Sequence, residues 1–286
     1  MSGGVGRAFG RDRLAVVTGP TSGIGKEVAR GLAAMAFEVV LACRNPQKGE
    51  AVRQEISRGT GNPRVSVELV DLASLASIRD FARRFDETHP RLDVLVNNAG
   101  VFLRHRHVTL DGLETQFAVN ALAPIVLTRH LAESLRRAAP SRVVNVSSNA
   151  HYGGRIEFDN LQGERSYSGF RAYANSKLAL VLLTYESARR FRESGILVNA
   201  VHPGIIRTNL GKGEYPRIVE VFRPFFKGPR RGAETPLYVA NHPELIGVTG
   251  KYFAKMRAIP SDDKSYDEPT ARRLWETCAR LSGLPP

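Results

Sequence analysis

Short apolar runs alternate with longer amphipathic segments along most of the chain. Apolar runs bounded by turn residues predict strands, and apolar positions spaced three and four residues apart predict helices. We expect strands at residues 14–18, 38–42, 65–69, 93–96, 142–146 and 196–201, and a short edge strand at 250–253. We expect helices at residues 24–35, 46–58, 74–88, 112–137, 170–193 and 270–281, the fourth of them kinked at Pro124.

This interleaving of strands and helices predicts an α/β fold. Strands joined through helices form βαβ units, which build a parallel sheet with helices on both faces. We therefore expect a Rossmann-type, doubly wound parallel sheet of about seven strands. The chain has 286 residues, 42% of them hydrophobic, and shows no repeat or linker, so we expect one domain over 1–286.

Two segments interrupt the alternation. Residues 149–169 are polar and rich in turn residues. Residues 205–231 are irregular and contain Pro216, Pro224 and Pro229 together with an apolar and aromatic cluster at 219–226. We expect this second segment to be a substrate lid, because long loops in compact domains commonly cover binding sites. Contact of the same cluster with a membrane surface is the alternative, disfavoured because Pro224 interrupts a surface helix. A helical tail at 266–286 closes the chain.

Composition narrows the function classes. The net charge is +13, but the basic residues are spread as pairs along the chain rather than gathered in a nucleic-acid-binding motif, so we expect no nucleic-acid partner. The two cysteines, Cys43 and Cys278, form no disulfide framework and no metal-ligand spacing. Residues 1–13 lack a secretory signal, and no apolar stretch is long enough for a transmembrane anchor. We expect a cytoplasmic protein without a bound metal.

A glycine-rich turn follows the first predicted strand and opens the first predicted helix. The candidate cofactor-binding residues in it are Gly19, Thr21, Ser22, Gly23, Ile24 and Gly25. Glycines allow the backbone to turn tightly and to approach a pyrophosphate, and a helix N-terminus offers free N–H groups to phosphates. The alternative is an ordinary strand-to-helix turn. The position of this turn in the first βα unit favours nucleotide binding.

The end of the second predicted strand indicates which dinucleotide binds. A carboxylate at this position holds the ribose 2′-hydroxyl of NAD(H), whereas an arginine accommodates the 2′-phosphate of NADP(H). The sequence has Arg44 there and Lys48 one turn later, with no acidic residue at the strand end. We therefore expect NADP(H) to be preferred, with NAD(H) also accepted. The alternative is that both residues are surface cations.

Tyr173 and Lys177 lie four residues apart in a predicted helix and so share one face of it. A free tyrosine, with a pKa near ~10, is a poor acid or base at neutral pH. A neighbouring cation lowers that pKa, so the pair could exchange a proton with an alcohol or carbonyl oxygen. Taken alone, the spacing also fits two solvated residues.

Together these motifs resemble the classical short-chain dehydrogenase/reductase family. The glycine-rich turn, NNAG at 97–100 and YANSK at 173–177 occur in the family's order, and the resemblance runs from residue 14 to about residue 253. ACRN at 42–45, VNVSSNAH at 144–151 and DNLQG at 159–163 are similar to the retinol dehydrogenase-like branch. That branch has a comparable insertion at 149–169 and commonly carries an N-terminal membrane anchor, which is not visible here.

The resemblance assigns roles to individual residues. Tyr173 would be the catalytic acid/base, and Lys177 would bind the nicotinamide ribose. Ser148 would hydrogen-bond the substrate oxygen, with Ser147 as the competing candidate, and Asn120 would organise a proton-relay water. Further cofactor contacts are implied for Asp71, Leu72, Asn98, Gly100, Pro203, Gly204 and Thr208.

The expected function is hydride transfer between NADP(H) and a lipophilic alcohol, aldehyde or ketone. A non-catalytic cofactor-binding regulator or scaffold on the same fold is the alternative. By analogy with the family, the helices at 112–137 and 170–193 would mediate a homodimer.

Overall fold

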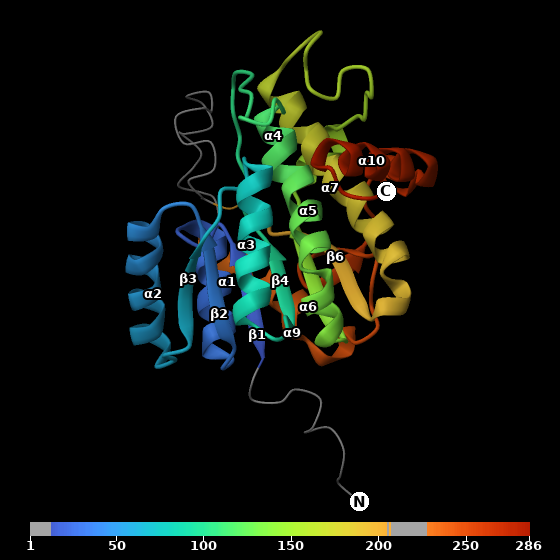
Figure 1. Ribbon diagram of the computed structural model, residues 1–286. Helices are drawn as coiled ribbons and strands as arrows, with labels where there is room; N and C mark the ends of the chain where they lie inside the picture. The colour runs from blue at the N-terminus through green and yellow to red at the C-terminus, as the bar shows by residue number, and fades with distance from the viewer. Residues whose placement is uncertain (1–12, 205, 207–227) are drawn as a thin grey trace, which may run out of the picture.

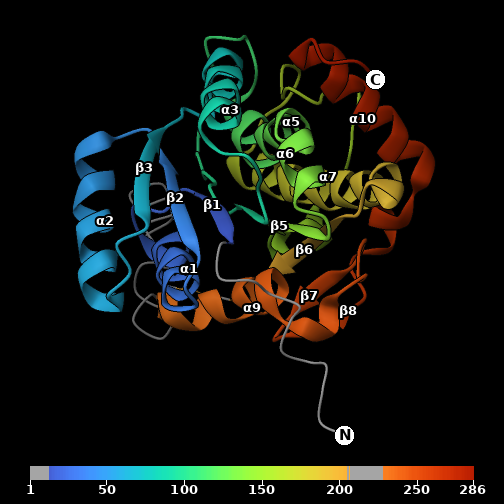
Figure 2. The ribbon, with the colours of Figure 1, turned by 60° about the horizontal axis from the view of Figure 1, so that its bottom comes forward.

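A computed structural model describes residues 13–204, 206 and 228–286. One eight-stranded sheet runs through it in the order β3-β2-β1-β4-β5-β6-β7-β8 (Figures 1 and 2). Its strands are β1 (Leu14–Thr18), β2 (Glu38–Cys43), β3 (Val65–Leu69), β4 (Val94–Asn97), β5 (Ser141–Val146), β6 (Ile196–His202), β7 (Tyr252–Ala254) and β8 (Arg257–Ile259). The expected doubly wound α/β fold is confirmed.

The sheet has one strand more than expected. β1 to β7 pair in parallel, and β8 pairs antiparallel with β7, so β8 rather than β7 forms the edge. A tight turn at Lys255 and Met256 joins the two strands, and both residues adopt positive φ angles. This hairpin was missed because its turn lacks the glycine or asparagine that usually marks such a conformation.

Helices cover both faces of the sheet (Figure 2). They are α1 (Gly23–Ala34), α2 (Pro46–Thr60), α3 (Leu75–Thr88), α4 (Thr115–Phe117), α5 (Ala123–His130), α6 (Ala132–Arg137), α7 (Gly169–Arg190), α9 (Pro229–Asn241) and α10 (Glu268–Ser282). Alternate residues of each strand face opposite layers. Leu14 and Val16 of β1 join the core beneath α3, α5, α7 and α10, while Ala15 and Val17 join the core beneath α1, α2 and α9.

The expected single helix at 112–137 is divided into the α-helices α4, α5 and α6, with a π-helical turn between α4 and α5. It begins at Thr115, contains a π-helical turn η1 (Ala118–Leu122), and breaks again at Leu131 between α5 and α6. Pro124 is the second residue of α5, just beyond the π turn, where its missing N–H costs little. The irregularity therefore starts before the proline and places Asn120 inside a widened turn, which is a common setting for functional residues.

Helix α9 was not expected. Pro229 and Arg231, assigned to the end of the lid, instead form its first turn, and Pro236 lies inside it. Two prolines and a glycine make this stretch a poor helix former on its own. Packing decides otherwise, because α9 lies directly against α1. A Cβ added to Gly31 of α1 would lie 2.5 Å from Cδ1 of Leu237.

The C-terminal segment returns across the α7 side of the sheet. A short 3-10 helix η6 (Asp263–Tyr266) leads into α10, which packs against α7 and α5 (Figure 1). Leu274 and Trp275 of α10 are buried. The remaining expected positions 205 and 207–227, including Thr208 and the aromatic cluster of the lid, lie outside the described residues. Within the described chain, no helix is both long enough and apolar enough to cross a membrane.

Candidate active site

A cleft of about 440 Å³ opens at the carboxyl ends of the central strands, where the strand order reverses between β1 and β4. Ligands of open α/β sheets bind at this position, because neighbouring loops diverge there. The sequence-predicted residues that line it are Gly19, Thr21, Ser22, Gly23, Ile24, Gly25, Arg44, Asp71, Leu72, Asn98, Gly100, Tyr173, Lys177 and Pro203. Segments far apart in the sequence thus meet around one cavity.

The glycine-rich turn is fixed against β4. Gly19 has a positive φ of 64°, and Asn98 Nδ2 donates to the carbonyl oxygens of Thr18 at 3.0 Å and Gly19 at 3.3 Å. At Gly25, an added Cβ would lie 2.3 Å from Asn98 Nδ2 and 2.4 Å from the Gly19 oxygen. Only glycine at this position lets the first turn of α1 approach the glycine-rich turn so closely.

The N-terminus of α1 has no side-chain cap. Ser22 occupies the capping position without a side-chain hydrogen bond, whereas Asn45 caps α2 and Ser74 caps α3. The first-turn N–H groups of α1 therefore face the cleft with positive partial charge and without a side-chain acceptor. An anionic group such as a pyrophosphate fits this end of the site.

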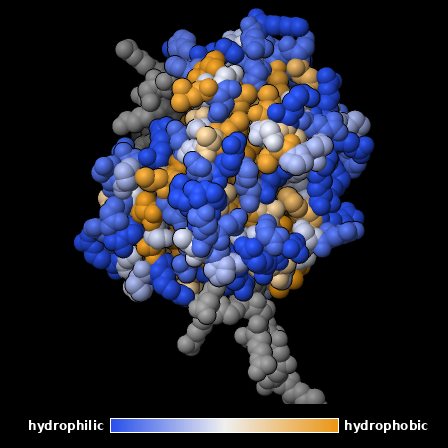
Figure 3. Space-filling model, viewed as in Figure 1, coloured by the Kyte–Doolittle hydropathy of each residue, from blue (hydrophilic) through white to orange (hydrophobic). Residues whose placement is uncertain are grey.

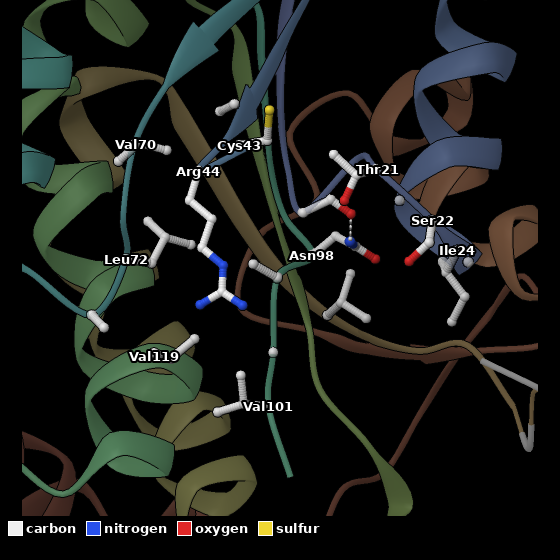
Figure 4. A pocket seen from close by; sticks show the side chains of 18 of the residues that line it. Thr21, Ser22, Ile24, Cys43, Arg44, Val70, Leu72, Asn98, Val101 and Val119 are labelled. Carbon is white, nitrogen blue, oxygen red and sulfur yellow. Dashed lines mark hydrogen bonds between the residues drawn. The ribbon is translucent and has the colours of Figure 1, made fainter. Parts of the chain in front are cut away.

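Arg44 lies on the far side of the same cleft. It is exposed at the end of β2, and its side chain reaches into the cavity between Leu72 and Asn98 (Figure 4). Thr21, Ser22 and Ile24 line the opposite side (Figure 4). Lys48 does not line the cleft, and its backbone N–H donates to the Asn45 cap of α2 at 2.8 Å.

Tyr173 and Lys177 project from α7 into the other end of the cleft. Both side chains are almost fully buried, and Lys177 Nζ lies 5.7 Å from the centre of the Tyr173 ring. The ring of Phe102 packs edge-on against Tyr173 with the centroids 5.7 Å apart. The two residues of the predicted pair thus share one buried face, as the four-residue spacing indicated.

Burial alters the chemistry of Lys177. Loss of hydration disfavours its charged form and lowers its pKa to about 8. Its Nζ donates to the Val146 carbonyl oxygen at 3.0 Å. A Cβ added to Gly100 would lie 3.5 Å from this Nζ and 3.3 Å from Asn120 Oδ1, so the glycine leaves space beside both groups.

Asn120 is fully buried behind this end of the cleft. Its Oδ1 accepts from the Val101 N–H at 2.8 Å, and its Nδ2 donates to the Val101 oxygen at 2.9 Å and to Ser176 Oγ at 3.0 Å. Ser176 Oγ in turn donates to the backbone carbonyl oxygen of Tyr173 at 2.7 Å. The side chain of Asn120 therefore joins η1, the β4 loop and α7 next to Lys177.

The two adjacent serines have different environments. Ser147 is buried, and its hydroxyl donates to the Lys177 carbonyl oxygen at 3.1 Å. Ser148 is half-buried, and its Oγ accepts from the Ala150 N–H at 3.2 Å. A hydroxyl that accepts one bond still has its proton to donate. Ser147 lines the cleft and Ser148 lies beside it, at the start of the turn η2 (Asn149–Gly153).

The family model described as short chain dehydrogenase matches residues 13–217. The chain belongs to the short-chain dehydrogenase/reductase family. It is 44% identical over 281 residues to retinol dehydrogenase 13 of Mus musculus, covering 95% of this chain and 84% of the relative. It is 39% identical over 291 residues to human retinol dehydrogenase 14, covering 95% and 87%. The expected family and its retinol dehydrogenase-like branch are confirmed, and the chain is an oxidoreductase acting on CH–OH groups.

Solved structures of other proteins agree with this family assignment. A blue fluorescent protein from a metagenomic library, crystallised in complex with NADPH, is 29% identical and superposes with a TM-score of 0.68, covering 85% of this chain and 96% of that one.

Some lining residues of this dehydrogenase were not predicted. They are Ala42, Cys43, Val70, Ala73, Ala99, Val101, Thr115, Val119 and Val146, and Ser147, the competing candidate for the substrate hydrogen bond, also lines the cleft. Most of these residues lie at or just after the carboxyl end of a strand, or next to a predicted residue in the sequence. The position of each strand end in a parallel sheet could therefore have indicated them. Gly204, with a positive φ of 93°, does not line the cleft. Within the described ranges, no group of three His, Cys, Asp or Glu residues is arranged to hold a metal ion.

The insertion at 149–169 packs against the cleft wall rather than away from it. Gln162 Oε1 accepts from the Glu114 N–H at 2.7 Å, and the Tyr167 hydroxyl donates to Glu114 Oε1 at 3.1 Å. Gln116 Nε2 donates to the Tyr167 hydroxyl at 2.8 Å. Burial beside the Glu114 carboxylate raises the pKa of Tyr167 to about 12, so its proton remains in place. The insertion is thereby held on α4.

Proposed function

We propose that this dehydrogenase transfers a hydride between NADP(H) and a lipophilic alcohol, aldehyde or ketone, with Tyr173 as the acid/base. The observation that carries the proposal is the shared cleft. Its one end has the uncapped α1 N-terminus and Arg44, and its other end has buried Tyr173 and Lys177. The residues that would recognise phosphate and those that would transfer the proton thus line one cleft of about 440 Å³.

The cofactor, when bound, supplies or accepts the hydride. The N-terminus of α1 would hold its pyrophosphate, and Arg44 would neutralise the 2′-phosphate, which favours NADP(H) over NAD(H). Leu72, Val101 and Val119 offer apolar walls. The NADPH complex of a structural relative supports this assignment.

The chain's own residues would manage the proton. Tyr173 gives its phenolic proton to the substrate oxygen during reduction and takes it back during oxidation. Protonated Lys177 at 5.7 Å from the ring favours the phenolate and would bind the nicotinamide ribose. Ser148 would donate its hydroxyl proton to the oxygen as negative charge develops. Asn120 would organise the water that returns a proton to this site.

The substrate end of the site is apolar. The ring of Phe102 packs edge-on against Tyr173, and Val101 and Val119 line the same cleft, so an uncharged substrate is favoured there. The relatives named retinol dehydrogenases make retinol and retinal the first compounds to examine. Aliphatic aldehydes and steroid ketones form the comparison set.

Tyr173→Phe tests the proposal. We expect kcat for NADPH-dependent aldehyde reduction to fall by about 10²- to 10⁴-fold while NADPH still binds, because only the proton donor is removed. NADPH oxidation and NADPH fluorescence titration measure the two properties. Tyr238→Phe is the matched control, since Tyr238 lies in α9, outside the cleft lining. Retained turnover in Tyr173→Phe would refute the mechanism, and binding without turnover in the unmodified protein would favour the scaffold alternative.

The expected homodimer remains a prediction. The apolar faces of α5 and α7 contact α3 and α10 of the same chain, with Leu274 and Trp275 buried there. The face over these helices is mostly polar, with apolar side chains in separate clusters (Figure 3). A dimer through α5 and α7 would need α10 to move. Sedimentation at working concentration decides this, and a monomer mass refutes the homodimer.

A further inference from the structure

The turn that follows Ser148 is held by a distant part of the chain. We name residues 260–266, between β8 and α10, the C-terminal strap. The Tyr152 hydroxyl of the turn donates to the Pro260 oxygen of the strap at 3.2 Å. Lys264 Nζ of the strap donates to the carbonyl oxygens of Tyr152 at 3.2 Å and Gly154 at 3.0 Å. Two segments about a hundred residues apart are therefore joined at the edge of the active site.

His151 is the buried centre of this junction. Its side chain is fully shielded from solvent and lies between the rings of Tyr152, at 4.1 Å between centroids, and Tyr252, at 4.8 Å. Nδ1 lies 2.7 Å from the Ser148 carbonyl oxygen, and Nε2 lies 3.1 Å from the Asp262 backbone nitrogen. The imidazole thus spans the space between Ser148 and the strap.

The partners of the ring fix its tautomer. A backbone N–H can only donate, so Nε2 of His151 must accept from Asp262 and carries no proton. A carbonyl oxygen can only accept, so Nδ1 must carry the proton and donate to Ser148. Both hydrogen bonds are satisfied together only by the neutral Nδ1–H form. Burial lowers the pKa of His151, which agrees with a neutral ring.

The strap is also fastened to the helix that carries Tyr173. The Tyr185 hydroxyl of α7 and Ser261 Oγ of the strap lie 2.6 Å apart, and Ser261 Oγ lies 2.6 Å from Ser265 Oγ. All three side chains are buried. A continuous chain of contacts therefore runs from α7 through the strap and His151 to Ser148.

We propose that His151, held by the C-terminal strap, is a positioning residue that orients Ser148 relative to Tyr173 for the shared substrate oxygen. The inference rests on the proposed catalytic role of Ser148. Ser148 begins the turn η2, and its carbonyl accepts both the His151 ring and the His151 backbone N–H at 3.1 Å. The hydrogen bond from the His151 ring connects Ser148 to the strap, whereas the hydrogen bond from the His151 backbone N–H does not. A donor misplaced by about 1 Å loses much of its catalytic effect, so a rigid connection is of direct use.

Two substitutions separate the two hydrogen bonds of the ring. In His151→Asn, the amide nitrogen can take the place of Nδ1 and donate to Ser148, but it does not reach Asp262. In His151→Gln, the amide oxygen can take the place of Nε2 and accept from Asp262, but the donor to Ser148 is lost. Each variant loses one buried hydrogen bond. Thermal unfolding should therefore show a similar loss of stability in both variants.

Steady-state kinetics with NADPH and retinal distinguish a positioning role from a structural one. We expect His151→Gln to lower kcat on the order of 10- to 100-fold with an unchanged NADPH dissociation constant. We expect His151→Asn to keep kcat within a few-fold of the unmodified enzyme, which is the rescue by a conservative variant. Equal kcat values for the two variants would overturn the proposal, because a general loss of stability affects both alike.

Ser148→Ala separates this inference from the proposed function. We expect its kcat to fall about 10²- to 10³-fold, as when one donor to a developing oxyanion is removed. If Ser148→Ala loses activity and His151→Gln does not, the positioning role alone is refuted. If Ser148→Ala keeps full activity, the proposed role of Ser148 fails, and the inference fails with it.

Discussion

Replacing Lys177 with Met should stabilise the cofactor-free protein at pH 7 while removing its activity. The buried ammonium has its pKa lowered from 10.5 to about 8, a difference worth about 3 kcal/mol against the charged native state. Methionine has a similar shape and no charge, but it loses the 3.0 Å hydrogen bond from Nζ to the Val146 oxygen. That loss costs about 1 kcal/mol. The net gain is therefore about 2 kcal/mol, roughly the sum of these two opposing effects.

The sign of this difference should depend on pH. Between pH 8 and 10.5 the unfolded chain holds the Lys177 proton more firmly than the native chain does. The free energy of unfolding of the unmodified protein therefore rises with pH across this window. The variant lacks the lysine and so lacks this pH dependence. At the alkaline end the variant should be less stable by about 1 kcal/mol, the value of the lost hydrogen bond.

Urea unfolding at several pH values from 7 to 10, with cofactor absent, measures this difference directly. Lys251→Met is the matched control, since Lys251 is exposed and its variant should show no crossover. A Lys177→Met protein that is less stable at pH 7, or a stability difference that does not change with pH, would refute the reasoning. Loss of activity with gained stability would show that the enzyme keeps a destabilising charge for its function.

Three further predictions concern the cofactor end and the subunit contacts. Arg44→Asp should shift preference from NADPH toward NADH, and an unchanged ratio of kcat/KM values would remove Arg44 from the phosphate role. Gly25→Ala should weaken NADPH binding in a fluorescence titration and destabilise the fold by about 1–3 kcal/mol, because its Cβ would overlap Asn98 and Gly19. Gly59→Ala is its control, since the nearest atom there is 3.5 Å away, and tolerance of both would contradict the close-approach argument. Leu274→Ala in α10 should lower the unfolding midpoint without changing the sedimented mass, and dissociation of a dimer would instead place α10 at a subunit interface.

The sequence determined the central fold because its signals are local. Runs such as residues 14–17 are apolar on both faces, and β1 is buried throughout. The glycine-rich turn and the Tyr173–Lys177 spacing carry their geometry within one turn or one helix face. These motifs also sufficed to predict the family, which the comparisons confirmed.

Other features depend on contacts with residues that are distant in the sequence, which a local pattern does not predict. Helix α9 contains two prolines, and its packing against Gly31 of α1 outweighs its poor local propensity. Hairpin β7–β8 turns at residues without the usual turn chemistry. The π turn at Asn120 is stabilised by bonds to Val101 and Ser176, far away in sequence.

The active site also has some features that the sequence predicted and others that only the tertiary structure showed. Residue types and spacing indicated Tyr173, Lys177 and the phosphate-binding turn. Only tertiary structure showed that Lys177 is buried deeply enough to lower its pKa, and that His151 links Ser148 to the C-terminal strap. Burial and long-range hydrogen bonds arise when the chain packs, because both depend on what lies across the sheet rather than along the sequence.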